Sequence, residues 1–195
     1  MANNRWRDHY SEKARQEKWL ARSVYKLEEI DRKYHLLRKG THVLDLGCYP
    51  GSWSQYCLKI VGNTGSVVGI DLFKPKGFIT PNFRFLEADI HNVDPKWLVN
   101  EVGRVDLTLS DMAPKTSGVI VSDTSRSMEL AEKALEIALA VLKEKGHFLC
   151  KIFEGEGLKG FRKNSSEYFK QTRIIRPQAV RKKSREVYLL GHGLL

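Results

Sequence analysis

The chain has 195 residues, of which 42% are hydrophobic and 29% charged, a balance that fits one globular domain with its own core. No apolar run approaches the roughly 20 residues that a membrane-spanning helix needs, and the start, MANNRWRDHYSEK, lacks the apolar segment of a secretory signal. We therefore expect a single cytoplasmic domain over residues 1–195 with no membrane partner. The formal net charge of +10 favours a polyanionic partner, and nucleic acid is the commonest one.

Basic residues are concentrated at the two ends of the chain. Residues 1–33 hold nine Lys and Arg against six Asp and Glu, and residues 151–186 hold eleven against four. Within the second region, RPQAVRKKSR (176–185) has five basic residues and no acidic one. We expect residues 1–33 to form a basic N-terminal arm or helix, and we expect this arm and residues 176–185 to hold the phosphates of a nucleic acid. Four aromatic side chains of the arm either stack on bases or anchor it to the core: Trp6, Tyr10, Trp19 and Tyr25.

Apolar runs that suit strands alternate with helical patterns. Strands are predicted at 41–47, 66–72, 83–89, 105–111, 147–153 and 185–191, and helices at 52–61, 95–101, 127–146 and 157–170. In the clearest helix, 127–146, Gly146 follows two lysines and predicts the C-terminal stop. Strands that alternate with helices predict an α/β fold with a mostly parallel sheet and right-handed crossovers.

Chemistry-bearing residues fall at the ends of the predicted strands. Ligands of such sheets bind beyond the carboxyl ends of the strands. We therefore expect five residues to converge on one crevice: Gly47, Asp71, Asp89, Asp111 and Lys151. Lys151 stands inside the apolar run HFLCKIF (147–153), where a lysine is almost never buried without a partner. A place at the crevice would explain it.

The loop DLGCYPGSW (45–53) has the spacing G-x-x-x-G, which differs from the glycine patterns of dinucleotide-binding and P-loop proteins. Gly47 and Gly51 permit a tight turn and a close backbone approach. Asp71, 24 residues after Gly47, is placed to bind ribose hydroxyls, and Asp89 ends the next strand, where adenine would lie. The glycine pair alone suits an ordinary strand-to-helix turn. Together with both acids it favours S-adenosylmethionine, which carries ribose and adenine without phosphates.

The fourth strand runs into SDMAPKTSG (110–118). Pro114 holds the preceding residue extended, so Asp111 begins a constrained loop and does not cap a helix. The three cysteines, Cys48, Cys57 and Cys150, form no CxxC pair and lie in apolar segments, and the six histidines show no ligand spacing. We expect small buried thiols in a reducing compartment and no metal.

At this point the chain resembles the FtsJ/RrmJ (RlmE) family of ribosomal RNA ribose 2′-O-methyltransferases. The resemblance covers nearly the whole chain. It rests on five segments in matching order: RSVYKLEEID (22–31), DLGCYPGSWSQY (45–56), SDMAP (110–114), KIFEGEG (151–157) and SREVYLL (184–190). One departure is CYPGS in the first loop, where many relatives carry AAPGG, so that Cys48 and Tyr49 add bulk beside the cofactor.

The resemblance implies a Lys-Asp-Lys-Glu tetrad, which falls on Lys26, Asp111, Lys151 and Glu186. It also implies contacts of S-adenosylmethionine with Gly51, Trp53, Asp71, Asp89 and Asp111. The implied fold is a Rossmann-like class I methyltransferase sheet of seven strands, mostly parallel, with the last two strands as an antiparallel pair and helices on both faces. The implied substrate is a uridine ribose in large-subunit ribosomal RNA within the assembled subunit, and we expect a monomer. Without the resemblance, Lys26 suits a solvated helix pair with Glu29, and Glu186 suits an exposed strand charge.

Three other functions remain open. A transfer-RNA or messenger-cap ribose methyltransferase would keep the fold and the chemistry. A non-catalytic RNA-binding factor of ribosome assembly would tolerate a degenerate tetrad, whereas all four positions are intact here. A small-molecule methyltransferase fits the charge of +10 poorly. The fold alone does not choose among these.

Overall fold

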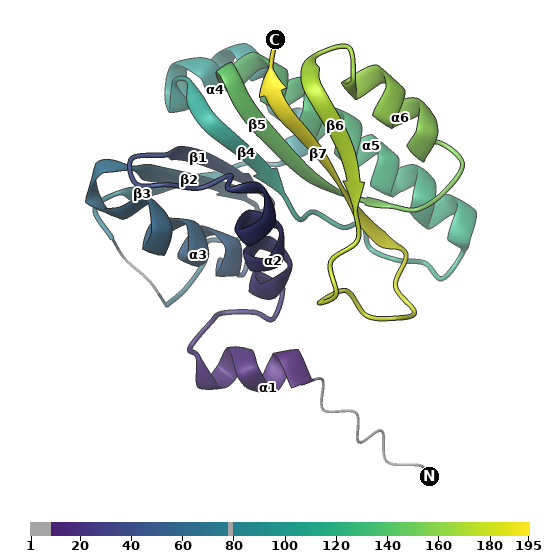
Figure 1. Cartoon of the computed structure of the whole chain (residues 1–195), viewed down its shortest axis with the longest axis horizontal. Coiled ribbons are helices and arrows are strands. Elements are labelled where there is room, and N and C mark those ends of the chain that lie inside the picture. Colours follow the sequence, from purple (N-terminus) through teal and green to yellow (C-terminus); the bar gives the residue numbers. More distant parts are fainter. Residues whose placement is uncertain (1–8, 78–79) are drawn as a thin grey trace.

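A seven-stranded sheet in the order β3-β2-β1-β4-β5-β7-β6 runs through the molecule (Figure 1). The computed structural model describes residues 9–77 and 80–195. Strands β1 to β5 are parallel to one another, whereas β7 is antiparallel to both β5 and β6. The predicted mostly parallel sheet with an antiparallel last pair is thereby confirmed. The strands are β1 (His42–Leu46), β2 (Ser66–Asp71), β3 (Phe83–Glu87), β4 (Val105–Ser110), β5 (Leu142–Phe153), β6 (Phe169–Ile175) and β7 (Glu186–Leu194).

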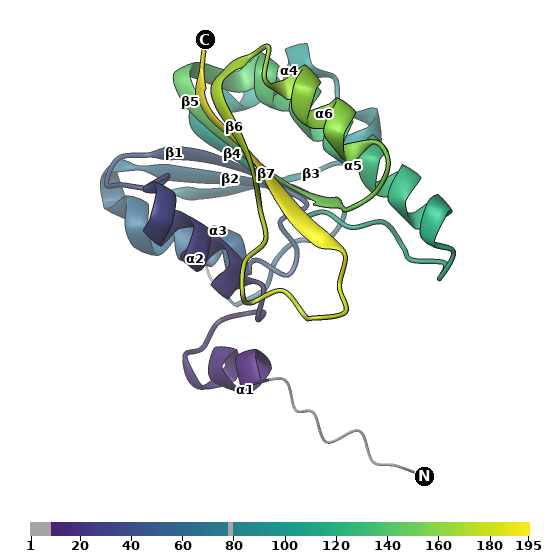
Figure 2. The same ribbon diagram turned by 45° about the vertical axis from the view of Figure 1, so that its right-hand side comes forward.

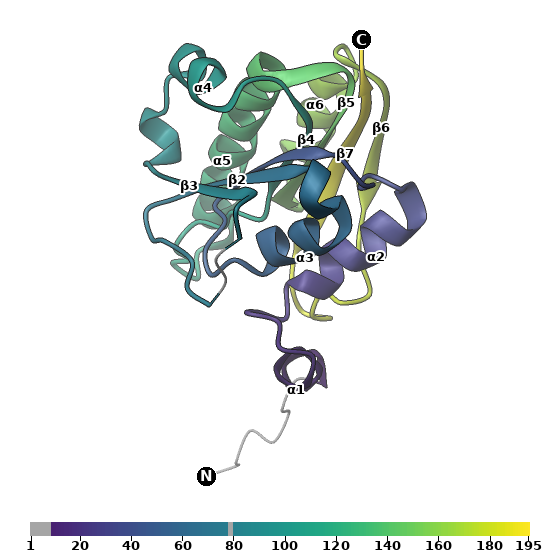
Figure 3. The same ribbon diagram turned by 90° about the vertical axis from the view of Figure 1, so that its left-hand side faces the viewer.

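Six α-helices occur in the described ranges, and the last five of them cover the two faces of the sheet (Figure 1). They are α1 (His9–Gln16), α2 (Val24–Tyr34), α3 (Ser52–Val61), α4 (Pro95–Val102), α5 (Ile120–Val141) and α6 (Leu158–Ser165). Helices α2 and α3 lie on one face, and α4, α5 and α6 on the other (Figures 2 and 3). Alternating strand side chains supply the two cores: Phe148 and Cys150 of β5 point to one, and Leu149 to the other. None of the helices described is both long and apolar enough to cross a bilayer.

The predicted helix 127–146 is wrong at both ends. It begins at Ile120, and it ends at Val141 because Leu142 is extended and pairs with Val105 of β4. Gly146 lies inside β5 and does not end a helix. A Cβ at this position would stand 2.8 Å from the carbonyl oxygen of Lys143. The glycine therefore permits close backbone packing near the register shift between β4 and β5.

The predicted helix 157–170 is also too long. It ends at Ser165, and residues 169–175 form the edge strand β6, which the sequence reading missed. Strand β6 pairs only with β7, and most of its side chains are at least partly exposed. An edge strand of this kind lacks the continuous apolar run that identifies a central strand. The other predicted helices agree within about a residue, and so do the strand starts except that of β5, which begins at Leu142 and not at 147. The strand predicted at 185–191 continues to Leu194.

The β6–β7 loop (176–185), helix α1 and the first turn of α5 lie toward the same end of the molecule (Figures 1 and 2). Within the region expected as an N-terminal arm, α2 packs into the core through Val24, Leu27 and Ile30. Tyr25 is buried and its ring contacts that of Tyr10. Trp19 contacts Tyr56, so these three aromatic side chains anchor the segment; Trp6 lies outside the described residues.

Candidate active site

Four charged side chains from four separate elements meet at the carboxyl end of the central strands. They are Lys26 of α2, Asp111 after β4, Lys151 of β5 and Glu186 at the start of β7. Lys26 Nζ lies 2.8 Å from Glu186 Oε2 and 3.9 Å from Asp111 Oδ1. Lys151 Nζ lies 3.3 Å from Asp111 Oδ1 and 3.9 Å from Glu186 Oε1. Positive and negative groups therefore alternate, and each ammonium lies between two carboxylates.

This arrangement explains the lysine within the apolar run. Lys151 is only 7% exposed, as is Lys26, and its ammonium also donates to the main-chain carbonyl of Asp111 at 3.0 Å. Strand β5 brings it there because Phe153 pairs with Glu186 in the antiparallel register with β7. The cost of burying each ammonium is offset by two opposite charges and, for Lys151, by a further acceptor.

The alternative in which Lys26 pairs with Glu29 is wrong. The Glu29 carboxylate instead accepts from the backbone N–H of Gln178 at 2.8 and 3.0 Å. Glu29 thus ties the β6–β7 loop to α2. Glu186 is half-buried by its contacts, which contradicts the exposed strand charge that the sequence alone suggested.

A fifth residue, Tyr188, completes the cluster and was missed by the sequence reading. Its hydroxyl donates to Asp111 Oδ1 at 2.6 Å, and its side chain is fully buried. Burial and the neighbouring Asp111 carboxylate raise the pKa of Tyr188 well above its usual value, so the phenol stays protonated and keeps donating. Tyr188 stands two residues after Glu186 on the same strand, and this spacing places both on one face. This alternation of side chains along a strand is the feature of the sequence that could have identified Tyr188.

A cavity of about 410 Å³ adjoins the charged cluster. Its size suits a small-molecule ligand. The structure brings together in its lining the four strand-end residues Gly47, Asp71, Asp89 and Asp111, as expected from the topology. Lys151 lies beside this cavity and is joined to it through Asp111.

The two acids at the far side of the cavity keep acceptor capacity. The Asp71 carboxylate accepts the backbone N–H groups of Tyr49 at 2.9 Å and Phe73 at 3.1 Å. Asp89 accepts the backbone N–H of His91 at 3.0 Å. Because each carboxylate oxygen has two lone pairs, both residues can still accept hydroxyl or amine protons.

Trp53 and Gly51 lie beside a narrower recess between the cavity and α2. Trp53 lines it and donates from its indole nitrogen to the carbonyl of Ser23 at 2.9 Å. Gly51 is buried just before α3 with a φ of +112°, a conformation that favours glycine. It shapes the turn and does not line either hollow. Asp45, a residue that the sequence reading did not single out, also lines the recess, and burial raises its pKa to about 7.

The residues that line the cavity suit an adenosine without phosphates. Among the described residues, no lysine or arginine lines it, whereas a pyrophosphate needs cations or a free helix N-terminus. Two carboxylates suit the ribose hydroxyls and the adenine amine, and Ile90 and Met112 give apolar walls. Glycine at position 47 lets the side chain of Met112 pack directly against the backbone, because a Cβ on Gly47 would stand 2.3 Å from Met112 Cγ.

The two larger side chains of the CYPGS segment, Cys48 and Tyr49, occupy different places. Cys48 is buried and turns toward the sheet, where a Cβ on Gly69 would lie 2.7 Å from its sulfur. Tyr49 stands 54% exposed at the rim of the cavity and contacts the ring of Phe73. Cys57 and Cys150 are buried free thiols, as expected. In residues 9–77 and 80–195, no group of three or more His, Cys, Asp or Glu side chains is arranged to hold a metal ion.

Comparison with known proteins gives consistent matches over most of the chain. A family model described as FtsJ-like methyltransferase matches residues 19–194. A protein named Ribosomal RNA large subunit methyltransferase E from Desulfatibacillum aliphaticivorans is 46% identical over 189 residues, which cover 96% of this chain and 91% of that protein. A protein of the same name from Desulfosudis oleivorans is 44% identical over 184 residues, covering 94% and 89%. A crystal structure of a ribosomal RNA methyltransferase from Plasmodium falciparum is 27% identical with a TM-score of 0.80, covering 91% of this chain and 99% of that one.

Proposed function

The chain belongs to the FtsJ-like methyltransferase family, and from this premise we propose that it methylates a ribose 2′-oxygen of large-subunit ribosomal RNA with S-adenosylmethionine as donor. The observation that carries the proposal is the alternating cluster of Lys26, Asp111, Lys151 and Glu186 beside a cavity that suits adenosine. We further propose a uridine as the target, the assembled large subunit as the substrate, and a cytoplasmic monomer. We take residues 1–195 as one methyltransferase domain in which residues 1–33 form the basic N-terminal arm.

Bound S-adenosylmethionine supplies an electrophilic methyl group on a sulfonium. The protein holds the donor through the cavity and the adjoining recess. We assign to cofactor binding Asp71, Asp89 and Asp111, which line the cavity, Trp53, which lines the recess, and Gly51, which shapes the turn before α3. Asp111 connects donor and acceptor, because it lines the cavity and contacts both lysines. Holding two reactants in line supplies roughly 7–11 kcal/mol in favourable cases. Alignment is therefore the main contribution that we assign to this site.

The acceptor hydroxyl must lose its proton during attack. We assign Lys151 to orient the 2′-hydroxyl and to receive that proton. Its ammonium must first give up a proton to water, since only a neutral amine has a lone pair. Lys26 and Glu186, joined at 2.8 Å, position the ribose and the Lys151 amine. Tyr188 holds the Asp111 carboxylate in place through its 2.6 Å hydrogen bond.

The test is transfer of labelled methyl from S-adenosylmethionine to large ribosomal subunits, free large-subunit RNA and bulk transfer RNA, followed by digestion to nucleosides. Label on a uridine 2′-oxygen from subunits is the expected result. Label in transfer RNA alone would keep the chemistry and refute the substrate. Absence of label with the cofactor still bound would favour an assembly factor that does not catalyse.

The role assigned to Lys151 is tested with a variant of that residue. Lys151→Ala should abolish turnover and leave the cofactor dissociation constant unchanged, measured by titration calorimetry. Lys145→Ala is the matched control, because Lys145 is exposed at the opposite end of the same strand. Equal turnover by Lys151→Ala and the wild type would contradict the assignment.

A further inference from the structure

A second hollow, of about 420 Å³, opens beside the charged cluster and has no lining residue in common with the cofactor cavity. It shares Lys26 and Glu186 with the cluster. All of its lining residues are polar or charged, and they carry four positive groups against one negative: Arg22, Ser23, Lys26, Arg181, Lys183, Ser184 and Glu186. Arg22, Arg181 and Lys183 are the positive groups of this hollow that lie outside the four-residue charged cluster.

Arg22 is fixed in this hollow by the fold. Its Nη2 donates to the carbonyl of Ala179 at 2.6 Å, and its guanidinium lies 5.6 Å from the centre of the Tyr10 ring. Burial and the charge of Arg181 lower the pKa of Arg22. Arg22 and Arg181 thus present two guanidinium groups to the same hollow, and like charges gathered in one place favour an anion there.

The basic β6–β7 loop divides into two kinds of side chain. Arg176 and Arg185 turn toward Glu154: Arg176 pairs with its carboxylate at 3.7 Å, and Arg185 donates to its main-chain carbonyl. Arg181 and Lys183 line the hollow instead. Lys182, between them, is exposed and does not line it. The positive charge next to the active site thus comes from particular side chains and not from the loop as a whole.

RNA carries an anion next to the ribose hydroxyl that would react. The 3′ phosphodiester is bonded to the ribose carbon next to the one that carries the 2′-hydroxyl, so a phosphate must accompany the reacting oxygen wherever it binds. We propose that Arg22, Arg181 and Lys183 form the site for the phosphodiester on the 3′ side of the target ribose, with Ser23 and Ser184 as hydroxyl donors. This proposal rests on the proposed function, and it makes the three cations positioning groups that set the depth at which the ribose enters the cluster.

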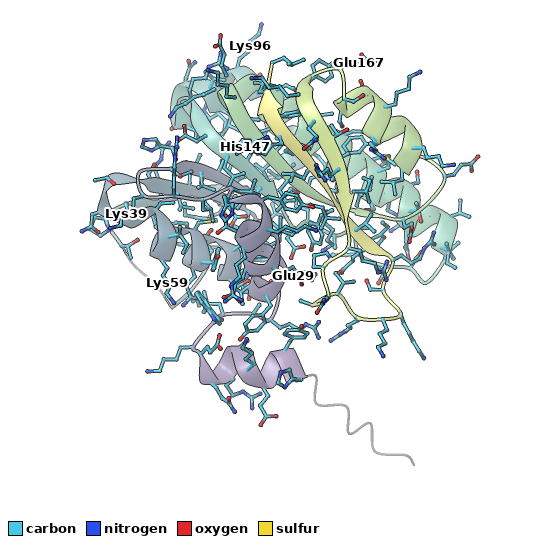
Figure 4. The ribbon with its side chains drawn as sticks, viewed as in Figure 1. Glu29, Lys39, Lys59, Lys96, His147 and Glu167 are labelled. Carbon is cyan, nitrogen blue, oxygen red and sulfur yellow. The ribbon has the colours of Figure 1, made fainter. Side chains whose placement is uncertain are left out.

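The test compares charge reversals that are one residue apart. Lys183→Glu should raise the KM for the RNA substrate by about tenfold or more. It should also reduce the slope of the logarithm of the RNA-binding constant against the logarithm of salt concentration by about 0.7–0.9, the amount expected for the loss of one phosphate contact. Lys182→Glu makes the same change of charge outside the hollow and should have a clearly smaller effect. Lys39→Glu, at a distant surface (Figure 4), is the control for net charge. The cofactor dissociation constant should stay unchanged in all three.

Equal increases in the KM for RNA in Lys182→Glu and Lys183→Glu would overturn the proposal, since they would show that the positive charge of the loop acts at long range and not at a defined phosphate site. A chemical counterpart removes the charge from the RNA. In a fragment centred on the methylated nucleotide, a neutral methylphosphonate at the 3′ linkage should weaken wild-type binding and have little further effect in Lys183→Glu. A larger effect of the same substitution at the 5′ linkage would also overturn it. Binding of large-subunit RNA by the wild type and the three variants is read by fluorescence anisotropy and needs no turnover, so failure of methyl transfer by the wild type would refute the proposed function and not this site.

Discussion

Asp45 lies on β1 with its side chain 1% exposed, beneath the recess that Trp53 lines. Its Oδ2 accepts the Ser54 hydroxyl at 2.6 Å. Burial is the largest cause that raises its pKa from 3.8 to about 7, and the negative charges of Asp111 and Asp71 add to it. The folded protein therefore holds this carboxyl group protonated at mildly acidic pH and must ionise it in a poor environment at pH 8.

The size of this effect follows from the two pKa values. A group whose pKa is raised on folding stabilises the fold fully below its unfolded pKa, and that stabilisation is lost as pH rises through the folded pKa. With 1.36 kcal/mol per unit, the shift from 3.8 to about 7 costs at most about 4 kcal/mol at pH 8 and about 2 kcal/mol at pH 5. Between these pH values the loss specific to Asp45 is about 2–3 kcal/mol.

The assay is urea denaturation of the wild type and Asp45→Asn at pH 5 and pH 8, without added cofactor. Asparagine does not titrate and keeps an oxygen for the Ser54 hydroxyl. The free energy of unfolding of the variant, relative to the wild type, should therefore rise by about 2–3 kcal/mol from pH 5 to pH 8. Parallel curves would refute the reasoning and show that the carboxylate is stabilised in the folded state. Asp106→Asn is the opposite control, because its hydrogen bonds and ion pair with Lys143 and His42 outweigh burial and lower the pKa of Asp106.

Two further predictions follow from neighbouring groups. Burial and the charge of His192 lower the pKa of His147 from 6.5 to about 4, so its stabilisation is present above pH 6.5 and is lost as pH falls toward 4. His147→Gln should reduce the loss of unfolding free energy at acid pH by less than about 3 kcal/mol, since the ring is partly exposed. If the melting temperatures of variant and wild type, each taken relative to its own value at pH 7.5, fell by the same amount across pH 4.5–7, this prediction would be contradicted. Tyr188→Phe removes the hydrogen bond to Asp111 and should lower kcat about tenfold with the cofactor dissociation constant unchanged, and an unchanged kcat would show that the cluster holds Asp111 without it.

The mostly parallel sheet and the crevice could be predicted because they depend on short-range patterns. Apolar runs alternating with helices imply parallel strands, and parallel strands bring their carboxyl ends together. Asp111 and Lys151 follow directly from that rule. Lys26 and Glu186 do not, because only the packing of α2 against β7, across 160 residues of chain, brings them together. Their roles were available from the resemblance and not from the residues alone.

The errors have equally local causes. The helical pattern of 127–146 continues past Val141, but pairing of Leu142 with Val105 outweighs it. Strand β6 lies at an edge and carries polar side chains, so its sequence resembles the end of a helix. Tyr188 was overlooked because an aromatic residue in a buried strand ordinarily serves packing, and only the position of Asp111 reveals what its hydroxyl does.

Asp111 shows why a charged cluster is tolerated at the end of an apolar sheet. Two ammonium and two carboxylate groups sum to no net charge, and Tyr188 adds a neutral donor on the carboxylate that contacts both lysines. Removing any one member leaves an unpaired charge in a half-buried place, which costs more than the lost contact. Activity lost in a single variant therefore combines catalysis with rearrangement of the remaining three groups. For this reason the cofactor dissociation constant, and not turnover alone, separates a role of Lys151 in proton transfer from a role in holding Asp111.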